Sequence, residues 1–551
     1  MDRGKLIAVA AGRERADLVI KNAGVFDVYG GSVIKGDVAV TGGVIAGVGK
    51  YSGKEEIDGG GKYVMPSFCD AHLHFESAAV RPSEYLKLAV PHGVTAFIAD
   101  PHEIANVCGM RGIEFMRADV RGVPADVRFM MPSCVPATPE DSSGACLTAA
   151  DADKGKRAGL YGLGEMMNVP GVLSCDPAVL AKLDVFDRID GHAPGLGGEG
   201  LNAYAAAGIS TDHECTTAEE AAERVSRGMY VLMREGSQAK NVRDLLPAVT
   251  ERNMRRFMFC SDDRNLDDVT KRGTIDDCVH IAVECGVDPV SAVAMAALNP
   301  SEAYGLRGRG AVAPGMSADL VISRDIAARE IEAVYCRGTK VAENGRALFK
   351  TSPADAAFAR GTVRLAPFGE AGFTLPFYPG MPVIGVSPRT LVTRLDHAES
   401  AEGLDLLCCM ERHRASGEIG RAYVSGFGLR GGAIASTVGH DSHNVAVIGD
   451  NARDMAAAVR ALAPDGGLSV CSGGKVTKAA LDIAGLMSSR TAEEVLAERR
   501  ALLSALDELC REPGIEPFML LSFLTLTVIP EAKLNTKGLY DVVKGAYVYR
   551  G

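Results

Sequence analysis

The chain has 551 residues, of which 47% are hydrophobic and 23% charged, and its formal net charge is −11. That length exceeds one ordinary domain, and that composition excludes a disordered chain. The negative charge argues against nucleic-acid binding as the main role, and no apolar stretch reaches the roughly 18 residues of a membrane-spanning helix.

The N-terminus and the cysteines indicate where the chain works. Residues 1–10 lack a convincing signal peptide, because their apolar stretch is short and charged residues follow it at once. The 14 cysteines are scattered, several of them in apolar runs, as Cys69, Cys134 and Cys260 are. No Cys-X-X-Cys spacing marks a structural zinc site. We therefore expect a cytoplasmic protein with reduced thiols and no membrane or nucleic-acid partner.

Two segments, one on each side of a central region, have the residue patterns of β-strands. Short bursts of alternating apolar and polar residues between 17 and 66 are broken by glycine turns, which predicts a small β-sheet unit. Similar strands return downstream, at 318–323, 331–335 and 346–349. We predict that residues 1–67 and 306–370 pair as one composite β-sandwich domain.

Between these flanks, residues 68–305 alternate short apolar strands with helical stretches. The clearest helical stretches are 82–89, 218–225 and 288–297. Such alternation predicts a parallel sheet, and the length is near the roughly 250 residues of a (β/α)8 barrel. A Rossmann-type sheet is the competing fold, but no Gly-X-Gly-X-X-Gly opens a helix after the first strand. The predicted fold class is therefore α/β, with a TIM-type barrel at its centre.

A third domain follows a stretch rich in Pro and Gly at 375–382. From there, residues 385–551 mix predicted strands with predicted helices. The strands are at 422–425 and 444–448, and the helices at 452–460 and 491–498. We predict a C-terminal α+β domain.

Metal-ligand residue types recur at the ends of the apolar runs in the barrel region. His72 and His74 form a His-X-His pair, and side chains two apart on a strand point the same way, so both imidazoles face one ion. Later runs end in further candidates, namely Glu165, His192, His213 and Asp262. If these runs are parallel strands of one barrel, all six side chains converge at its C-terminal face, where two divalent ions fit.

This ordered set resembles the amidohydrolase superfamily, and the residues around it narrow the resemblance to the adenine deaminase family. The segments that carry the likeness are 91–96, 99–106, 164–171, 190–194, 211–214, 233–237, 260–264, 425–429, 434–444 and 517–523. The likeness covers nearly the whole chain. Ala71, Phe75 and Ala78 depart from the family pattern, which usually has Gly, Ile and Ser there. None of these three positions is a predicted metal ligand, so we expect the differences to affect pocket fit and substrate range.

The resemblance implies a binuclear site in which Glu165 bridges two divalent metal ions held by the remaining ligands. It implies the hydrolytic deamination of adenine to hypoxanthine and ammonia, as in purine salvage. Metal-activated hydroxide would attack C6, Glu214 would deliver a proton to N1, and Asp262 would carry the hydroxide's proton to the departing amine. A donor set of oxygen and nitrogen favours manganese(II) or iron(II). The competing reading of Glu214 is that it caps the helix that follows it.

Other residues are candidates for supporting roles. Asp100 and His102 end the second barrel strand, where they would touch a further metal ion or the substrate, or fix hydrogen bonds around the ligands. Candidate substrate contacts are Arg234, Glu235 and Ser237. In the C-terminal domain, His440, Asp441 and His443 would close over the pocket or serve an interface.

Two rival functions stay open at this point. One keeps the site and changes the substrate to another aminopurine or a cyclic amide, although cyclic amidases of this superfamily usually have a bridging Lys where this chain has Glu165. The other is a non-catalytic scaffold that has lost its metals, which would require missing ligands, and none is missing. We also expect a homo-oligomer, as is usual in such families.

Overall fold

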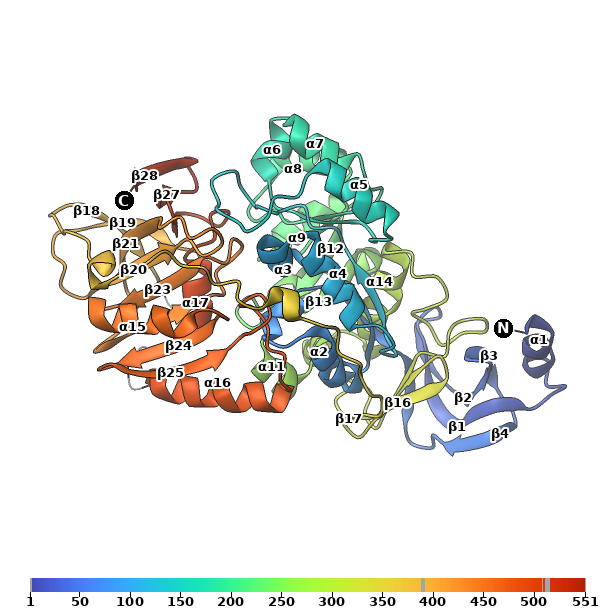
Figure 1. Cartoon of the computed structure of the whole chain (residues 1–551). Helices are drawn as coiled ribbons and strands as arrows, with labels where there is room; N and C mark the ends of the chain where they lie inside the picture. Colours follow the sequence, from blue (N-terminus) through green and yellow to red (C-terminus); the bar gives the residue numbers. More distant parts are fainter. Residues whose placement is uncertain (1, 388–391, 508, 511–515, 551) are drawn as a thin grey trace.

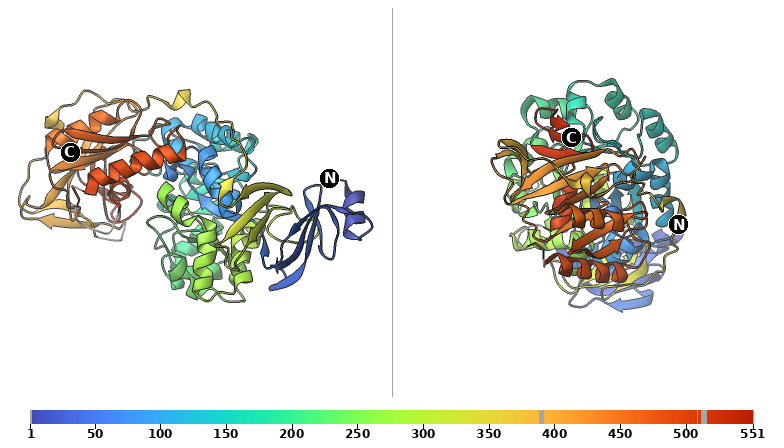
Figure 2. Two further views of the ribbon diagram at one scale, coloured as in Figure 1. Left: turned by 90° about the horizontal axis from the view of Figure 1, so that it is seen from below. Right: turned by 60° about the vertical axis from the view of Figure 1, so that its left-hand side comes forward.

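The computed structural model describes residues 2–387, 392–507, 509–510 and 516–550. A β-sheet unit that contains the N-terminus lies at one end, a barrel lies in the middle, and a C-terminal domain lies at the other end (Figure 1). The turned views in Figure 2 show the same order, with the barrel between the two outer parts. Within the described residues, no helix combines the length and the apolar character needed to cross a membrane.

The central part is a closed ring of parallel strands, as predicted. Within the fully described stretch 68–260, the strands are β6 (Phe68–Leu73), β7 (Val94–Ala99), β8 (Asp126–Phe129), β9 (Leu163–Met166), β10 (Ile189–Gly191), β11 (Thr211–Asp212), β12 (Tyr230–Arg234) and β13 (Phe257–Cys260). Parallel pairing joins β6 to β8, β9 to β10 and β11 to β13. Bridges between Met131 and Leu163 and between Leu73 and Asp262 help to complete the ring.

Helices follow the barrel strands along the chain. They are α2 (Pro82–Ala89), α3 (His102–Cys108), α4 (Met110–Asp119), α5 (Ala149–Arg157), α6 (Val169–Leu173), α7 (Pro177–Leu183), α8 (Gly198–Ala206), α9 (Ala218–Ser226), α10 (Val242–Leu245), α11 (Leu266–Arg272), α12 (Ile275–Glu284), α13 (Pro289–Ala296) and α14 (Leu298–Ala303). Three of them, α2, α9 and α13, match the helices predicted from the sequence. The start of α9 shows why: Thr217 and Glu220 cap each other's backbone N–H groups in a capping box.

The β-sheet unit draws its strands from both sides of the barrel. They are β1 (Ala16–Asp27), β2 (Ser32–Thr41), β3 (Val44–Gly49), β4 (Gly53–Asp58), β5 (Tyr63–Pro66), β14 (Leu320–Ser323), β15 (Ile331–Cys336), β16 (Thr339–Glu343) and β17 (Arg346–Ala347). All of them belong to one hydrogen-bonded sheet, in which β14 pairs antiparallel with β5. A helix that the sequence did not predict, α1 (Arg3–Ala10), buries Val9 against this sheet.

The C-terminal domain is built on a mixed sheet with the order β19-β18-β21-β20-β23-β22-β24-β25. Its elements are β18 (Met381–Gly385), β19 (Arg394–Ala398), β20 (Leu404–Met410), β21 (Ile419–Ser425), β22 (Gly432–Ser436), β23 (Val445–Gly449), α15 (Ala452–Leu462), β24 (Gly467–Ser472), β25 (Lys475–Ala480), α16 (Ala492–Asp507), α17 (Pro517–Phe523), β26 (Ala532–Asn535), β27 (Gly538–Asp541) and β28 (Ala546–Arg550). Helices α16 and α17 pack on one hydrophobic core and α15 on another. The predicted α+β character is confirmed.

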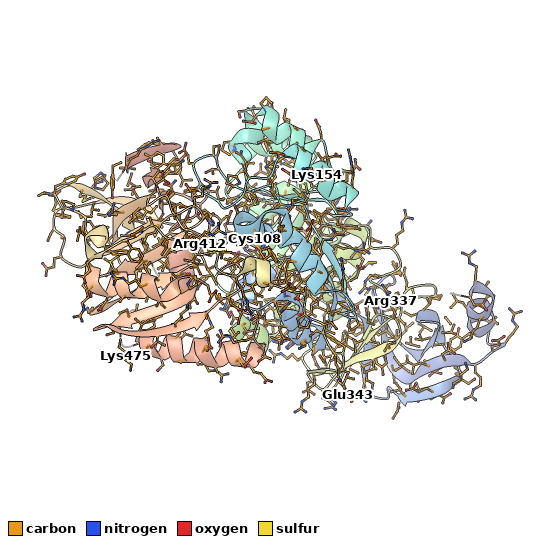
Figure 3. All side chains as sticks on the ribbon, in the orientation of Figure 1. Cys108, Lys154, Arg337, Glu343, Arg412 and Lys475 are labelled. Carbon is orange, nitrogen blue, oxygen red and sulfur yellow. The ribbon has the colours of Figure 1, made fainter. Side chains whose placement is uncertain are left out.

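The C-terminal domain meets the barrel at the loop between β22 and β23. Arg412 is fully buried and lies beside Cys108 of α3 (Figure 3). Its guanidinium donates hydrogen bonds to the backbone carbonyls of His443 and Ala484, and Asn444 donates to the carbonyl of Ser142 in the barrel. These contacts hold the β22–β23 loop against the mouth of the barrel.

Candidate metal centre

The six predicted ligands meet at the carboxyl ends of the barrel strands. They are His72 and His74 at the end of β6, Glu165 in β9, His192 after β10, His213 after β11 and Asp262 after β13. None is more than 6% exposed. Strands as short as β10 and β11 bring these side chains together because parallel strands of a barrel all end at the same face.

Glu165 lies between two groups of ligands and gives one carboxylate oxygen to each. Its Oε1 is 3.3 Å from His74 Nε2 and 3.7 Å from His72 Nε2. Its Oε2 is 2.8 Å from His192 Nδ1 and 3.3 Å from His213 Nε2. Asp262 completes the first group, with Oδ1 3.2 Å from His74 Nε2. A carboxylate placed in this way is positioned to bridge two ions.

The chemistry of these donors fits divalent metal ions. Backbone and carboxylate groups of Asp100 orient the ligands: its carbonyl lies 2.9 Å from His74 Nδ1, and its Oδ2 accepts a hydrogen bond from the Glu165 N–H. Burial lowers the pKa of His72 to about 4, so its imidazole is neutral and free to coordinate. His72 Nε2 and His74 Nε2 lie only 3.1 Å apart, facing the same carboxylates. The ligand atoms form groups of three, such as His72, His213 and Asp262, in which all atoms lie within 4.8 Å of one another, so that each group could hold an ion.

Glu214 follows the His213 ligand and faces the same space. Its Oε1 lies 3.6 Å from His213 Nε2 and 3.7 Å from His192 Nδ1. The buried Arg234 donates hydrogen bonds to both carboxylate oxygens of Glu214 and to Asp262 Oδ2, the latter at 2.8 Å. Burial raises the pKa of Glu214, but the charges of Arg234, His192 and His213 and the hydrogen bonds from Arg234 together lower it.

The competing reading of Glu214, as a helix cap, is wrong. The N-cap of α9 is Thr217, whose side chain accepts a hydrogen bond from the Glu220 N–H. Glu214 instead borders the cavity above the ligands. Its carboxylate therefore faces the space in which a ligand would lie.

A cavity of about 570 Å³ lies above the ligands, with walls from both the barrel and the C-terminal domain. Arg234, Gly236 and Gln238 border it on the barrel side, and Met519 and Phe523 of α17 on the other. Such a volume suits a small heterocyclic ligand.

Two of the predicted substrate contacts do not border this cavity. Glu235 turns toward Arg272, whose Nη2 is 3.4 Å from its Oε1, and Ser237 donates a hydrogen bond to Asp268. Along the chain they alternate with Arg234, Gly236 and Gln238, which do border the cavity. Phe75 also lies away from the cavity, packed against Tyr85 and Phe97, so its departure from the family pattern changes the barrel core.

The C-terminal candidates do close over the barrel. His440 Nδ1 lies 2.6 Å from Glu103 Oε1, and His443 Nε2 contacts Glu103 Oε2. His440 and Asp441 also border the cavity. Sequence reasoning missed Glu103, although it directly follows His102 in the Asp-Pro-His-Glu segment. Cys260, by contrast, packs with Cys69 and Leu232 in the barrel core.

Two family models match the chain. The amidohydrolase family matches residues 63–341, and the adenine deaminase C-terminal domain matches residues 389–546. The first covers the barrel with all six ligands, and the second covers the loop that carries His440 and Asp441.

Curated relatives match along nearly their whole length. An adenine deaminase of Nitratidesulfovibrio vulgaris (strain DP4) is 46% identical over 98% of this chain and 97% of its own. Adenine deaminase 2 of Desulfotalea psychrophila is 43% identical over 99% of this chain and 98% of its own. Among solved structures, an enamidase of the amidohydrolase superfamily is 19% identical over 60% of this chain and 96% of its own, with a TM-score of 0.47.

Proposed function

The chain belongs to the adenine deaminase family of the amidohydrolase superfamily, and on this basis we propose how its site converts adenine to hypoxanthine and ammonia. The observation that carries the proposal is the position of Glu165, with one oxygen toward each group of ligands, and of Glu214 beside the second group. His72, His74 and Asp262 would hold one divalent ion and His192 and His213 the other, with Glu165 shared.

When bound, two divalent ions would lower the pKa of a water enough to supply hydroxide near neutral pH. The protein's own task is to move protons. As C6 of adenine becomes tetrahedral, negative charge builds up on the ring, and a proton has to arrive at N1. Glu214 is placed to take the proton that the water loses and to deliver it to N1, because its carboxylate borders the cavity beside the second group of ligands.

Asp262 handles the second proton. Its Oδ1 faces His72 and His74, and its Oδ2 accepts a hydrogen bond from Arg234. It would take the proton of the attacking hydroxide and give it to the amine, which then leaves as ammonia. Arg234 donates hydrogen bonds to both Glu214 and Asp262 and so fixes the two carboxylates relative to each other.

The donor set supports the choice of metal. Imidazole nitrogens and carboxylate oxygens surround the site, and none of the six ligands is a thiol, so manganese(II) or iron(II) are the proposed ions. By the same reasoning from family and composition, we propose that the enzyme works in purine salvage, in the cytoplasm, and as a homo-oligomer.

The test is ammonia release from adenine by protein loaded separately with manganese, iron or zinc, with the metal counted on the same samples. We expect hypoxanthine to form in step with metal loading. The His72→Asn variant should lose metal and turnover together. Full activity in a His72→Asn enzyme with unchanged metal content would refute this ligand set, and turnover of other aminopurines or cyclic amides in place of adenine would refute the substrate.

A further inference from the structure

A second cluster of metal-ligand residue types lies beside the binuclear site, on the side of the C-terminal domain. His102 and Glu103 begin α3, Cys134 follows β8, and His440 and Asp441 come from the loop between β22 and β23. None of the five is more than 6% exposed. The barrel and the C-terminal domain therefore bring their own ligand types into one buried space.

The polar atoms of this cluster face one another at distances suited to a shared ion. His102 Nε2 is 3.4 Å from Glu103 Oε1 and 3.7 Å from Asp441 Oδ1. His440 Nδ1 is 2.6 Å from Glu103 Oε1 and 3.7 Å from Asp441 Oδ1. Donor atoms of His102, Cys134 and Asp441 lie within 4.8 Å of one another. Two ligand atoms about 2.0–2.3 Å from a tetrahedral ion are roughly 3.3–3.8 Å apart, as His102 Nε2 is from Glu103 Oε1 and from Asp441 Oδ1.

Hydrogen bonding among the described residues does not satisfy this cluster. Asp441 Oδ2 is buried and accepts no hydrogen bond from any of them, although the residue is only 5% exposed. Neither oxygen of Glu103 has a hydrogen bond of good geometry, despite three histidines nearby. Buried carboxylates without partners are costly unless a cation neutralises them.

We propose that His102, Cys134 and Asp441, with Glu103 and His440 beside them, form a third metal site for a transition metal ion such as zinc(II). Imidazole, carboxylate and thiolate are the ligands that zinc takes in proteins. The site differs from the binuclear centre in chemistry, because it contains a thiol and the binuclear centre does not. It does not rest on the deaminase activity.

His102 connects the third site to the first. Its Nε2 faces the new cluster, and its Nδ1 lies 3.2 Å from Glu165 Oε1. When Nε2 coordinates an ion, the proton of His102 is on Nδ1, the nitrogen that lies beside the bridging carboxylate of Glu165. The ion would thus link the β22–β23 loop to the barrel and hold this loop over the active site.

The thiol allows a spectroscopic test that is specific to the third site, because none of the six ligands of the binuclear centre is a thiol. The full-length enzyme is loaded with cobalt(II), and its absorption is recorded for the thiolate-to-cobalt charge-transfer band. We expect the band in the wild type and its loss in Cys134→Ser, with one fewer metal ion per chain. Cys260→Ser is the matched control, because Cys260 is another buried thiol two residues from the ligand Asp262, and it should keep the band.

A second variant keeps the proposal falsifiable if Cys134→Ser does not fold. Asp441→Asn removes the anionic ligand at nearly constant shape and should also lower the metal count by one ion, whereas Ser442→Ala on the same loop should not. A cobalt-loaded wild type without the band would overturn the proposal. So would a band that survives Cys134→Ser, or an unchanged metal count in Asp441→Asn.

Discussion

At the scale of single residues, the site depends on a balance of charge around Arg234. One guanidinium donates to both Glu214 and Asp262, and both carboxylates have lowered pKa values despite their burial. These are the two groups to which the mechanism assigns proton transfer. The pKa values of Glu214 and Asp262 therefore depend on Arg234, which is neither a proton-transfer group nor a metal ligand.

Replacing Glu214 with Gln should stop the reaction without emptying the site. The amide keeps the shape and the contact with Arg234 but has no proton to deliver to N1, so kcat should fall by about 10²–10⁴-fold. Metal content should be unchanged, because Glu214 is outside the six ligands. The measurement is kcat together with metal content. Unchanged turnover in Glu214→Gln would remove the residue from the mechanism.

Replacing Arg234 with Gln should move the pH profile. Loss of the positive charge removes the main effect that lowers the pKa of Glu214 against its burial, so that pKa should rise. The acidic limb of the kcat/KM profile should then shift to higher pH. Arg234→Lys is the matched control, because it keeps the charge. If the acidic limb lay at the same pH in Arg234→Gln and in the wild type, it would report the titration of a group other than Glu214.

Residue roles were predictable where the barrel topology alone brings side chains together. Every strand end faces the same side, so His72, Glu165 and Asp262 could be grouped from their positions in the chain. Cys134 could not be predicted as a site residue, because a single thiol in an apolar run is usually a packed core residue. Its proximity to Asp441 depends on how the C-terminal domain docks, and no periodicity in either segment encodes that.

At the scale of elements, His92 couples the entry of β7 to the start of α12. Its Nδ1 lies 2.7 Å from Asp276 Oδ2. Burial lowers the pKa of His92, but the Asp276 carboxylate outweighs this effect and raises it. A raised pKa in the folded state means that the charged pair stabilises the protein below about pH 6.5, and that this contribution is lost as pH rises through the folded pKa.

The His92→Asn variant should therefore be less stable at pH 6 than the wild type, by roughly 1 kcal/mol for a half-buried pair. The difference in Tm should shrink between pH 6 and pH 8.5, because His92 of the wild type loses its charge as the pH rises through its raised folded-state pKa. Comparing the two proteins at each pH cancels effects that they share, such as metal loss. A Tm difference that stays constant from pH 6 to pH 8.5 would mean that His92 contributes by packing alone.

Element prediction was reliable for segments with a clear pattern and failed for one segment without such a pattern. The helices α9 and α13 were predictable from their apolar spacing and from caps such as Thr217. Helix α1 was not, because its eight residues have no distinct apolar face and one buried side chain, Val9. Its helical state depends on the sheet beneath it, which is a tertiary contact.

At the scale of the whole molecule, the cavity exists only because two domains meet. The barrel supplies the ligands and Glu214, while α17 of the C-terminal domain supplies the opposite wall through Met519 and Phe523. Helix α17 is held in place at its start, where Glu516 accepts a hydrogen bond from the Met519 N–H. A ligand in the cavity therefore touches both domains, and substrate affinity should respond to changes far from the barrel in sequence.

The Phe523→Leu variant tests this arrangement. The ring of Phe523 packs on the ring of His440, with 4.5 Å between centroids, and forms part of the cavity wall. The leucine variant would lose an aromatic contact between this wall and adenine, a contact worth about 1 kcal/mol, so KM for adenine should rise roughly 5-fold. Because Phe523 touches none of the proton-transfer groups, kcat should change much less.

Leu521→Ala separates affinity from stability in the same helix. Leu521 is fully buried in the core of the C-terminal domain and does not border the cavity. Its truncation should lower Tm, since a buried Leu→Ala change costs about 2–5 kcal/mol, but should leave KM unchanged below the transition. If Leu521→Ala raised KM as much as Phe523→Leu, the helix would act through general loosening of the domain. A KM effect confined to Phe523→Leu would instead mean that the C-terminal domain contributes a wall of the substrate site.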